Sequence, residues 1–236
     1  MEQVRTGRFG MWSFARVAIV AALLLGVAAP GVMAADKDKE EDAQGLVDKA
    51  RVTLGEFMRD TNYLWLQENI GKAKGVLIYP QVVKAGFVLG GSGGTGVLLT
   101  KDAKTGAWTG PAFYTMGSVS YGLQIGGEVA EVILLVNSQK GVDSLLTNKF
   151  KLGGDIAVAL GPVGAGAKAE FADFYSFAKS KGLYAGMNLT GSVLDVRSSL
   201  NKAYYGKEVT PADILVKGSV SNAGADPLKE ELKKTK

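Results

Sequence analysis

The residue types that carry most enzyme chemistry are missing from this sequence of 236 residues, which contains no cysteine and no histidine. Their absence excludes a thiolate nucleophile, a disulfide framework, a Ser-His-Asp relay and a zinc site of the usual nitrogen and sulfur type. A metal ion would need oxygen ligands. We therefore expect neither a metal nor a cofactor.

Two pairs of acids remain as candidates for general acid–base catalysis, Glu128 with Glu131 and Asp143 with Asp155. Such catalysis needs two carboxylates that converge on one cleft and have shifted pKa values. Glu128 and Glu131 are three positions apart, which places them on opposite faces of a regular strand. A hydrolase that uses carboxylates stays open as an alternative, and we expect a protein that is not an enzyme.

A run of glycines in VLGGSGGTGVLL has the spacing of the GxGxxG dinucleotide fingerprint, at Gly91, Gly93 and Gly96. A dinucleotide site needs a helix directly after the glycines and an acid about 20 residues later. Here the glycines lead into a β-type run, and neither feature is present. The stretch instead predicts a flexible or bulged hairpin turn that joins 86–91 with 95–100. Its backbone amides, with Lys84 close in sequence, could cradle a phosphate group.

Lysines are the candidate ligands for an anionic partner. An ammonium group near a loop has adaptable reach and suits a phosphate at a membrane surface, where each contact is worth about 1 kcal/mol. The candidates form three groups along the chain, and they are Lys72 with Lys74, Lys84, and Lys149 with Lys151. Ordinary solvated lysines are the alternative at each position.

The first 34 residues are typical of a secretory signal, with three arginines, an apolar run at 17–29 and the small-residue exit PGVMA. The apolar run is shorter than the roughly 20 residues that a spanning helix needs. We therefore expect cleavage after Ala34 or Ala35, and a periplasmic or secreted protein that associates peripherally with a membrane. The remaining 24 basic and 22 acidic residues give a net charge of +2, which does not favour nucleic-acid binding.

After the signal, the sequence predicts one domain at 45–216, between a flexible charged N-terminus (35–44) and a disordered charged tail (217–236). The two flanking segments are rich in charge and poor in apolar residues. Apolar residues at helical spacing predict an amphipathic helix over 43–60. Thr210 followed by Pro211 predicts the start of a last helix.

Between these helices, short apolar runs separated by glycine predict strands. SVSYGLQI alternates apolar and polar residues, and EVILLV (131–136) is apolar after its first residue, Glu131, as expected of a central strand. Strands follow strands without regular helical crossovers. We predict an α+β fold, with a twisted, mainly antiparallel sheet or barrel-like core of short glycine-rich strands flanked by N-terminal and C-terminal helices. Tyr204 and Tyr205 suit a membrane interface or the edge of the core, and we favour the core.

An ordered set of segments resembles the SYLF-domain family, a lipid-binding module. The resemblance covers about residues 45–216. It is carried by AKGVLIYPQVVKAGFVLGGSGGTGVLL, GPAFYTMG, SYGLQIGGE, VILLV, KFKLGGDIAVALGPVG, YSFAKSKGLYAGMNLTGSVL and AYYG, in that order. In some eukaryotic members an amphipathic helix at the amino end of the module contacts membranes, and the matching segment here is 43–60.

The resemblance implies non-catalytic binding of anionic phospholipid headgroups, through the basic groups named above and nearby apolar residues. A structural or protein-interaction module of the cell envelope, with an envelope protein as partner, is the alternative. Actin binding belongs to some eukaryotic relatives, and for a chain with an export signal actin is a poor expectation as a partner.

Overall fold

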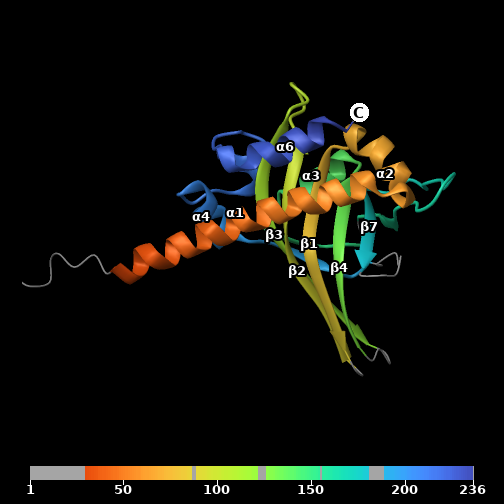
Figure 1. Cartoon of the computed structure of the whole chain (residues 1–236), viewed down its shortest axis with the longest axis horizontal. Coiled ribbons are helices and arrows are strands. Elements are labelled where there is room, and N and C mark those ends of the chain that lie inside the picture. Colours follow the sequence, from red (N-terminus) through yellow and green to blue (C-terminus); the bar gives the residue numbers. More distant parts are fainter. Residues whose placement is uncertain (1–29, 87–88, 122–125, 155, 181–188, 236) are drawn as a thin grey trace, which may run out of the picture. The chain divides into compact units, whose positions relative to one another are not determined.

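The computed structural model describes residues 30–86, 89–121, 126–154, 156–180 and 189–235. The chain divides into two units, residues 1–36 and residues 37–236. The second unit contains the complete sheet and the helices packed on it (Figure 1).

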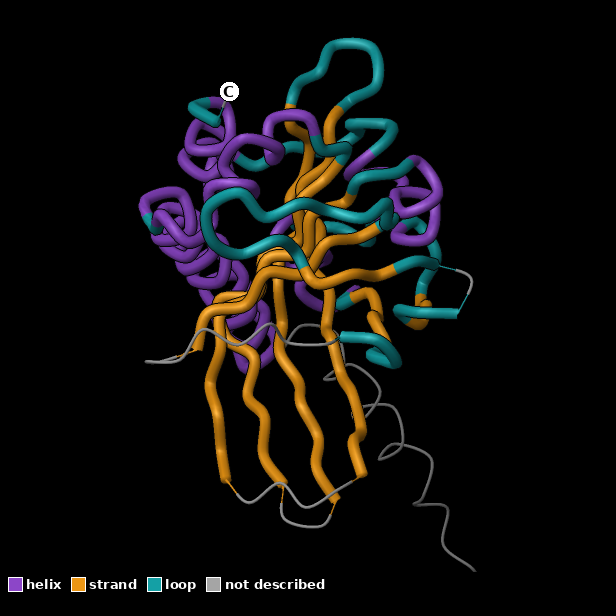
Figure 2. Tube along the Cα trace, turned by 90° about the vertical axis from the view of Figure 1, so that its right-hand side faces the viewer, coloured by secondary structure: helices purple, strands orange, loops and turns teal. Residues whose placement is uncertain are grey.

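Eight strands form one sheet in the order β5-β8-β3-β2-β1-β4-β7-β6. The strands are β1 (Gly75–Gly86), β2 (Leu89–Lys101), β3 (Trp108–Tyr121), β4 (Gly126–Val136), β5 (Lys149–Lys151), β6 (Val158–Leu160), β7 (Phe174–Ser180) and β8 (Val193–Val196). Neighbouring strands are antiparallel except β6 and β7. The sheet curls into a half-barrel (Figure 2), which confirms the predicted α+β fold. The four central strands, at 11 to 14 residues, are longer than expected.

Helices cover both faces of the sheet. They are α1 (Pro30–Arg59), α2 (Leu64–Asn69), α3 (Gln139–Leu145), α4 (Ser198–Tyr205), α5 (Pro211–Leu215) and α6 (Asp226–Lys233), with 3-10 turns η1 (Thr61–Tyr63), η2 (Ile70–Lys72) and η3 (Ala223–Ala225). On one face, α1 packs Leu54 and Phe57 against a cluster that includes Ile78 of β1. On the other face, α3 and α5 contribute to a second cluster. The sheet therefore separates two apolar cores.

Helix α5 begins as the sequence predicted. The Thr210 hydroxyl accepts a hydrogen bond from the Asp213 backbone amide at 3.2 Å, and the Asp213 carboxylate accepts one from the Thr210 amide at 3.0 Å. These two bonds form a capping box, and Pro211 occupies the first helical position.

Both ends of the expected domain differ from the structure. Residues 35–44 lie within α1 and not in an irregular segment. Within the expected disordered tail at 217–236, α6 buries Leu228 and Leu232 in the core beside α1. Two leucines four residues apart are enough to anchor a short helix, because they share one face and bury nearly all of their side chains.

The prediction of a hairpin turn at the glycine stretch is wrong. Gly91, Gly93 and Gly96 lie in the interior of strand β2. A β-bulge in the facing part of β1 explains why this part of β2 is rich in glycine. Three residues of β1, Tyr79 to Gln81, face only two of β2, and the bulge brings the β1 backbone close to Gly94 and Gly96. Glycine is needed at these two positions because a Cβ there would overlap the carbonyl oxygens of β1.

Four strands continue beyond the body as a projection that we call the β-arm (Figure 2). It consists of residues 82–86 of β1, 89–95 of β2, 116–121 of β3 and 126–130 of β4. Strand β8 pairs with β3 only up to Gly117, and β7 pairs with β4 only from Ala130. In the described part of the chain, the outer strands of the β-arm therefore have no further hydrogen-bonded neighbour.

Candidate functional site

The five lysines predicted to bind an anionic partner fall into separate places. Lys72 and Lys74 immediately precede β1, whereas Lys84 lies near its other end. About ten residues of strand separate Lys74 from Lys84, which corresponds to about 33 Å. Lys149 and Lys151 are on β5, at the far edge of the sheet from β1. The structure therefore does not bring the three predicted groups together.

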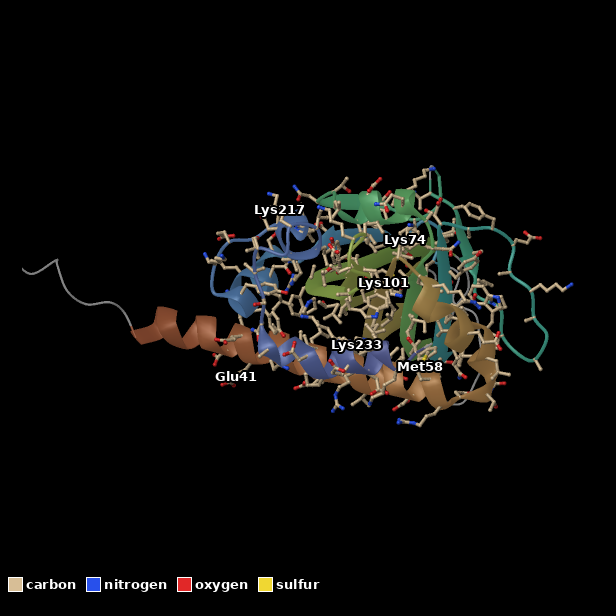
Figure 3. The ribbon with its side chains drawn as sticks, turned by 90° about the horizontal axis from the view of Figure 1, so that it is seen from above. Glu41, Met58, Lys74, Lys101, Lys217 and Lys233 are labelled. Atoms are coloured by element: carbon tan, nitrogen blue, oxygen red, sulfur yellow. The ribbon has the colours of Figure 1, made fainter. Side chains whose placement is uncertain are left out.

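Lys72 and Lys74 have two lysine neighbours that the sequence reasoning missed, Lys101 and Lys104. The backbone amide of Lys101 donates to the carbonyl of Lys74 at 2.9 Å, and Lys104 is exposed in the loop after β2. Figure 3 looks onto this end of the sheet and shows Lys74 and Lys101 close together. We call these four residues the lysine end. Antiparallel pairing could have revealed it, because the end of β2 must return beside the start of β1.

Two local interactions position charge at the lysine end. The Lys101 ammonium donates to the carbonyl of Gly71 and lies 5.1 Å from the centre of the Trp108 ring. The Asp102 carboxylate accepts hydrogen bonds from the amide and hydroxyl of Thr105 at 2.7 and 2.8 Å and from the amide of Lys104 at 3.1 Å. These bonds to Thr105 and Lys104 hold the pKa of Asp102 below its usual range. Asp102 is therefore ionised, and its negative charge offsets part of the positive charge of the lysine end.

Two of the other predicted lysines, Lys84 and Lys149, each face an acid, whereas Lys151 pairs with Val193 of β8. Lys84 lies opposite Glu128 across the β1–β4 pair. Lys149 lies 3.9 Å from Asp195, and both side chains are more than half exposed. Exposed pairs of this kind contribute little to stability, and they reduce the net positive charge that an anionic surface would meet.

Glu128 and Glu131 lie on opposite faces of β4, in agreement with their odd spacing. Glu131 faces α1, where its carboxylate accepts a hydrogen bond from the Thr53 hydroxyl at 2.6 Å. Glu128 is on the opposite face of β4, beside Lys84 of β1. Asp155, the partner considered for Asp143, lies outside the described residues. In the part of the chain that the structure describes, no group of three or more acids is arranged to hold a metal ion.

The apolar stripe of the helix predicted at 43–60 is buried. Leu54 and Phe57 are completely buried against the sheet, and Leu46 and Met58 pack partly against the same core. A membrane can reach these side chains only if α1 leaves the sheet. No helix among the described residues combines the length and apolar character required to cross a membrane.

Tyr204 and Tyr205 also belong to the core, as favoured from the sequence. Tyr204 is 2% exposed and packs edge-on against Phe113 at 5.2 Å between ring centres. The Tyr205 hydroxyl donates to the carbonyl of Pro111 at 2.8 Å. Both rings therefore pack into the protein, and neither points outward as a membrane anchor.

An open pocket of about 930 Å³ lies where the side of α1 meets the base of the β-arm. Its charged residues are Glu56 of α1, Glu128 and Glu131 of β4, and Lys179 of β7. The Lys179 ammonium lies 3.4 Å from Glu56 and 3.8 Å from Asp60. Burial, together with the nearby Glu56, raises the pKa of the Glu131 carboxyl. On the α1 side, three carboxylates therefore share one ammonium group.

The face of the β-arm that continues from this pocket is apolar and uncovered. Strand alternation places Val83, Val119 and Val129 on the same face as the residues that pack against α1. Their exposed fractions are 45%, 88% and 40%. Isolated exposed apolar residues are ordinary, but a contiguous apolar face marks an interaction site.

Comparison with known proteins identifies relatives of this fold. Residues 117–235 match the Ysc84 family model, described as Las17-binding protein actin regulator. The chain is 34% identical to an SH3 domain-containing protein of Schizosaccharomyces pombe, over 76% of this chain and 44% of the relative. It is 32% identical to human SH3 domain-containing YSC84-like protein 1, over 69% of this chain and 49% of the relative. It is 33% identical to Protein YSC84 of Saccharomyces cerevisiae, over 66% and 35%.

The chain thus spans about half or less of the length of these relatives. The family description names actin regulation. It overturns the expectation that actin is a poor candidate as a partner, which rested only on the export signal.

Proposed function

The chain belongs to the Ysc84 family, the SYLF-domain family, and from this premise we propose that it is a non-catalytic binding module that docks on anionic phospholipid surfaces. The lysine end is the observation that supports this proposal most directly. Lys72 and Lys74 are exposed there, and Lys101 and Lys104 extend the same positive surface.

The size of the effect follows from the number of lysines. Each positive charge near an anionic leaflet contributes about 1 kcal/mol, so the net charge of four lysines and Asp102 contributes about 3 kcal/mol, or about a hundredfold in the binding constant. Attraction of this strength is reversible and weakens with salt, because a charged surface is screened beyond about 8 Å at physiological ionic strength. The proposal therefore describes peripheral docking.

The test compares flotation of the full chain with neutral phosphatidylcholine vesicles and with vesicles that contain anionic phosphatidylglycerol. The double variant K72E/K74E should bind anionic vesicles at least tenfold more weakly than the wild type. The double variant K149E/K151E is the matched control, because it reverses two lysines on β5 away from the lysine end, and it should bind as the wild type does. Equal binding to neutral and anionic vesicles would contradict the proposal, as would equal losses in the two variants.

Export belongs to the same proposal. It is supported by the signal-like sequence of residues 1–34, with its basic segment and its short apolar run. Mass spectrometry of the protein recovered from its own cells should give a chain that begins at Ala35 or Asp36. Recovery of the chain with residues 1–34 still attached would contradict cleavage.

Binding to the actin machinery is the second candidate function. It is favoured by the family description, and the matched region runs from residue 117, within the last part of β3, through α6, so that it includes most of the outer strands of the β-arm. Filamentous actin is the first partner to test, by co-sedimentation of the full chain over a range of actin concentrations. A saturable bound fraction would support this function, and a bound fraction no larger than that of an unrelated protein of similar charge would contradict it.

A further inference from the structure

Four glycines lie on the α1 side of the β-arm, between the exposed valines, and at three of them the fold leaves ordinary room for a Cβ. They are Gly91, Gly93, Gly117 and Gly127. None of them has a positive φ. A Cβ would have no neighbour within 4 Å at Gly117 and only one contact, at 3.9 Å, at Gly127. Contacts at Gly93 and Gly91 would begin at 3.5 and 3.3 Å.

These glycines weaken the strands that contain them, because glycine in a strand loses more conformational entropy and has no side chain to pack. Gly94 and Gly96, in contrast, are required by the bulge in β1. Glycine inside a strand often marks a bulge, a tight bend or a place where another backbone or a ligand approaches closely. The register of the three strand pairs is not shifted at these four glycines, which favours close approach over a bulge at these positions. The β-arm therefore presents bare backbone between Val83, Val119 and Val129.

This face meets the side of α1 at the pocket described above, and together they form a corner groove. Its floor is the valine and glycine face, and its wall carries Glu56 and Glu131 with Lys179. Asp60 also lies beside Lys179. Among the described residues of this wall, the ammonium of Lys179 therefore compensates three carboxylates, those of Glu56, Asp60 and Glu131. The groove is thus apolar along the floor and has an excess of negative charge at one end.

The floor of the groove is small for a stable dimer through this face alone. Four strands about 4.8 Å apart and about six residues long present about 400 Å². A stable protein–protein interface buries about 800 Å² on each partner.

We propose that the corner groove binds an amphipathic, basic segment of a partner protein. Its small apolar side chains lie over the glycines and valines, and a lysine or arginine of the segment lies near Glu56 and Glu131. Close approach over the bare backbone supplies the packing, and the uncompensated carboxylates select a positive residue. This site is independent of the lysine end and goes beyond membrane docking.

The test uses a fluorescein-labelled helical peptide with a leucine and alanine face and flanking lysines, titrated with the full chain and followed by fluorescence anisotropy. The same peptide with glutamate in place of lysine is the reference. The lysine peptide should bind saturably below about 1 mM, and at least tenfold more tightly than the glutamate peptide. Gly117→Val should weaken binding at least tenfold without lowering the melting temperature, because its Cβ enters open space. Ser118→Val is the matched control, since this neighbour lies on the opposite face of β3, and it should leave peptide binding unchanged.

The charged wall gives a second measurement with opposite signs. Glu131→Gln should weaken binding of the lysine peptide, and Lys179→Gln should strengthen it, which a general loss of structure cannot produce. The proposal is overturned if neither charge variant changes affinity, if both peptides bind equally, or if Gly117→Val binds as the wild type does. It is also overturned if Gly117→Val abolishes self-association and leaves peptide binding intact, because a second copy would then be the occupant. K72E/K74E should bind the peptide normally, so failure of membrane docking and failure of the groove are distinguishable.

Discussion

Gly96 is the position where the fold depends most directly on the absence of a side chain. A Cβ there would overlap the carbonyl oxygen of Ile78 and lie 2.6 Å from the Cδ1 atom of Tyr79. Tyr79 is completely buried between the central strands and the elements on the far side of the sheet. Neither the backbone nor the ring can move aside without disturbing the core.

We therefore expect Gly96→Ala to lower the free energy of unfolding by about 3 kcal/mol, the upper part of the range for overpacked cores. Gly117→Ala is the matched control in the neighbouring strand, and with open space around its Cβ it should raise the free energy of unfolding by about 0.5 kcal/mol. The two alanine variants differ by one methyl group each from the wild type. Their predicted difference of about 3.5 kcal/mol therefore isolates the close approach of the β1 backbone.

The assay is urea unfolding followed by far-ultraviolet circular dichroism, analysed by linear extrapolation with the slopes compared among the variants. Equal slopes would show that the change in midpoint reports stability. If Gly96→Ala lies within about 1 kcal/mol of Gly117→Ala, the bulge is not a tight contact, and our explanation of the glycines in β2 is wrong.

Two further predictions concern the charged wall of the groove and the C-terminal helix. Burial and the nearby Glu56 raise the pKa of Glu131 in the folded state, so ionisation of this carboxyl destabilises the fold as pH rises through that pKa. Glu131→Gln should therefore be more stable than the wild type at about pH 7 and should lose this advantage at about pH 3, as measured by thermal unfolding over that pH range. Leu228→Ala should lower the free energy of unfolding by about 3 kcal/mol, because Leu228 is completely buried. The exposed control Glu230→Ala should change the free energy of unfolding by less than about 0.5 kcal/mol. Equal effects of the two variants in urea unfolding would show that α6 is not part of the cooperative fold.

The sheet could be predicted from the sequence because local pattern and tertiary role agree along most of it. EVILLV reads as a buried strand, and it forms the part of β4 that lies between β1 and β7. Strands without helical crossovers predict antiparallel neighbours, and the central strands are antiparallel. The helix at 43–60 followed from the spacing of residues such as Leu54 and Phe57, which the structure buries.

The glycine run could not be placed from the sequence, because glycine has the same local signature in a turn and in a strand that another backbone crosses closely. The distinction depends on the register between β1 and β2, and on the bulge at Pro80 and Gln81 that shifts it. A proline inside an apolar run was the available signal, since proline in a sheet is confined to edges, strand starts and bulges.

The spacing of the lysines along the chain does not predict which of them are neighbours in space. Lys74 and Lys84 are close in sequence, but an extended strand places them at opposite ends of the sheet. Lys74 and Lys101 are distant in sequence, yet a backbone hydrogen bond joins them because the hairpin of β1 and β2 returns to its start. A cluster of charges on a sheet therefore follows the register of the strands and not the spacing along the chain.

The same register determines how the two proposed surfaces relate. The lysine end is at the start of β1, and the corner groove begins beyond the bulge, so Lys74 and Val83 are about 30 Å apart along one strand. Charges at this separation are screened from one another at physiological salt, where the Debye length is about 8 Å. The carboxylates of the groove are therefore too far from the lysine end to weaken the proposed attraction of its lysines to an anionic membrane. If the molecule docks by its lysine end as proposed, the β-arm points away from the lipid surface, and the corner groove stays accessible to protein.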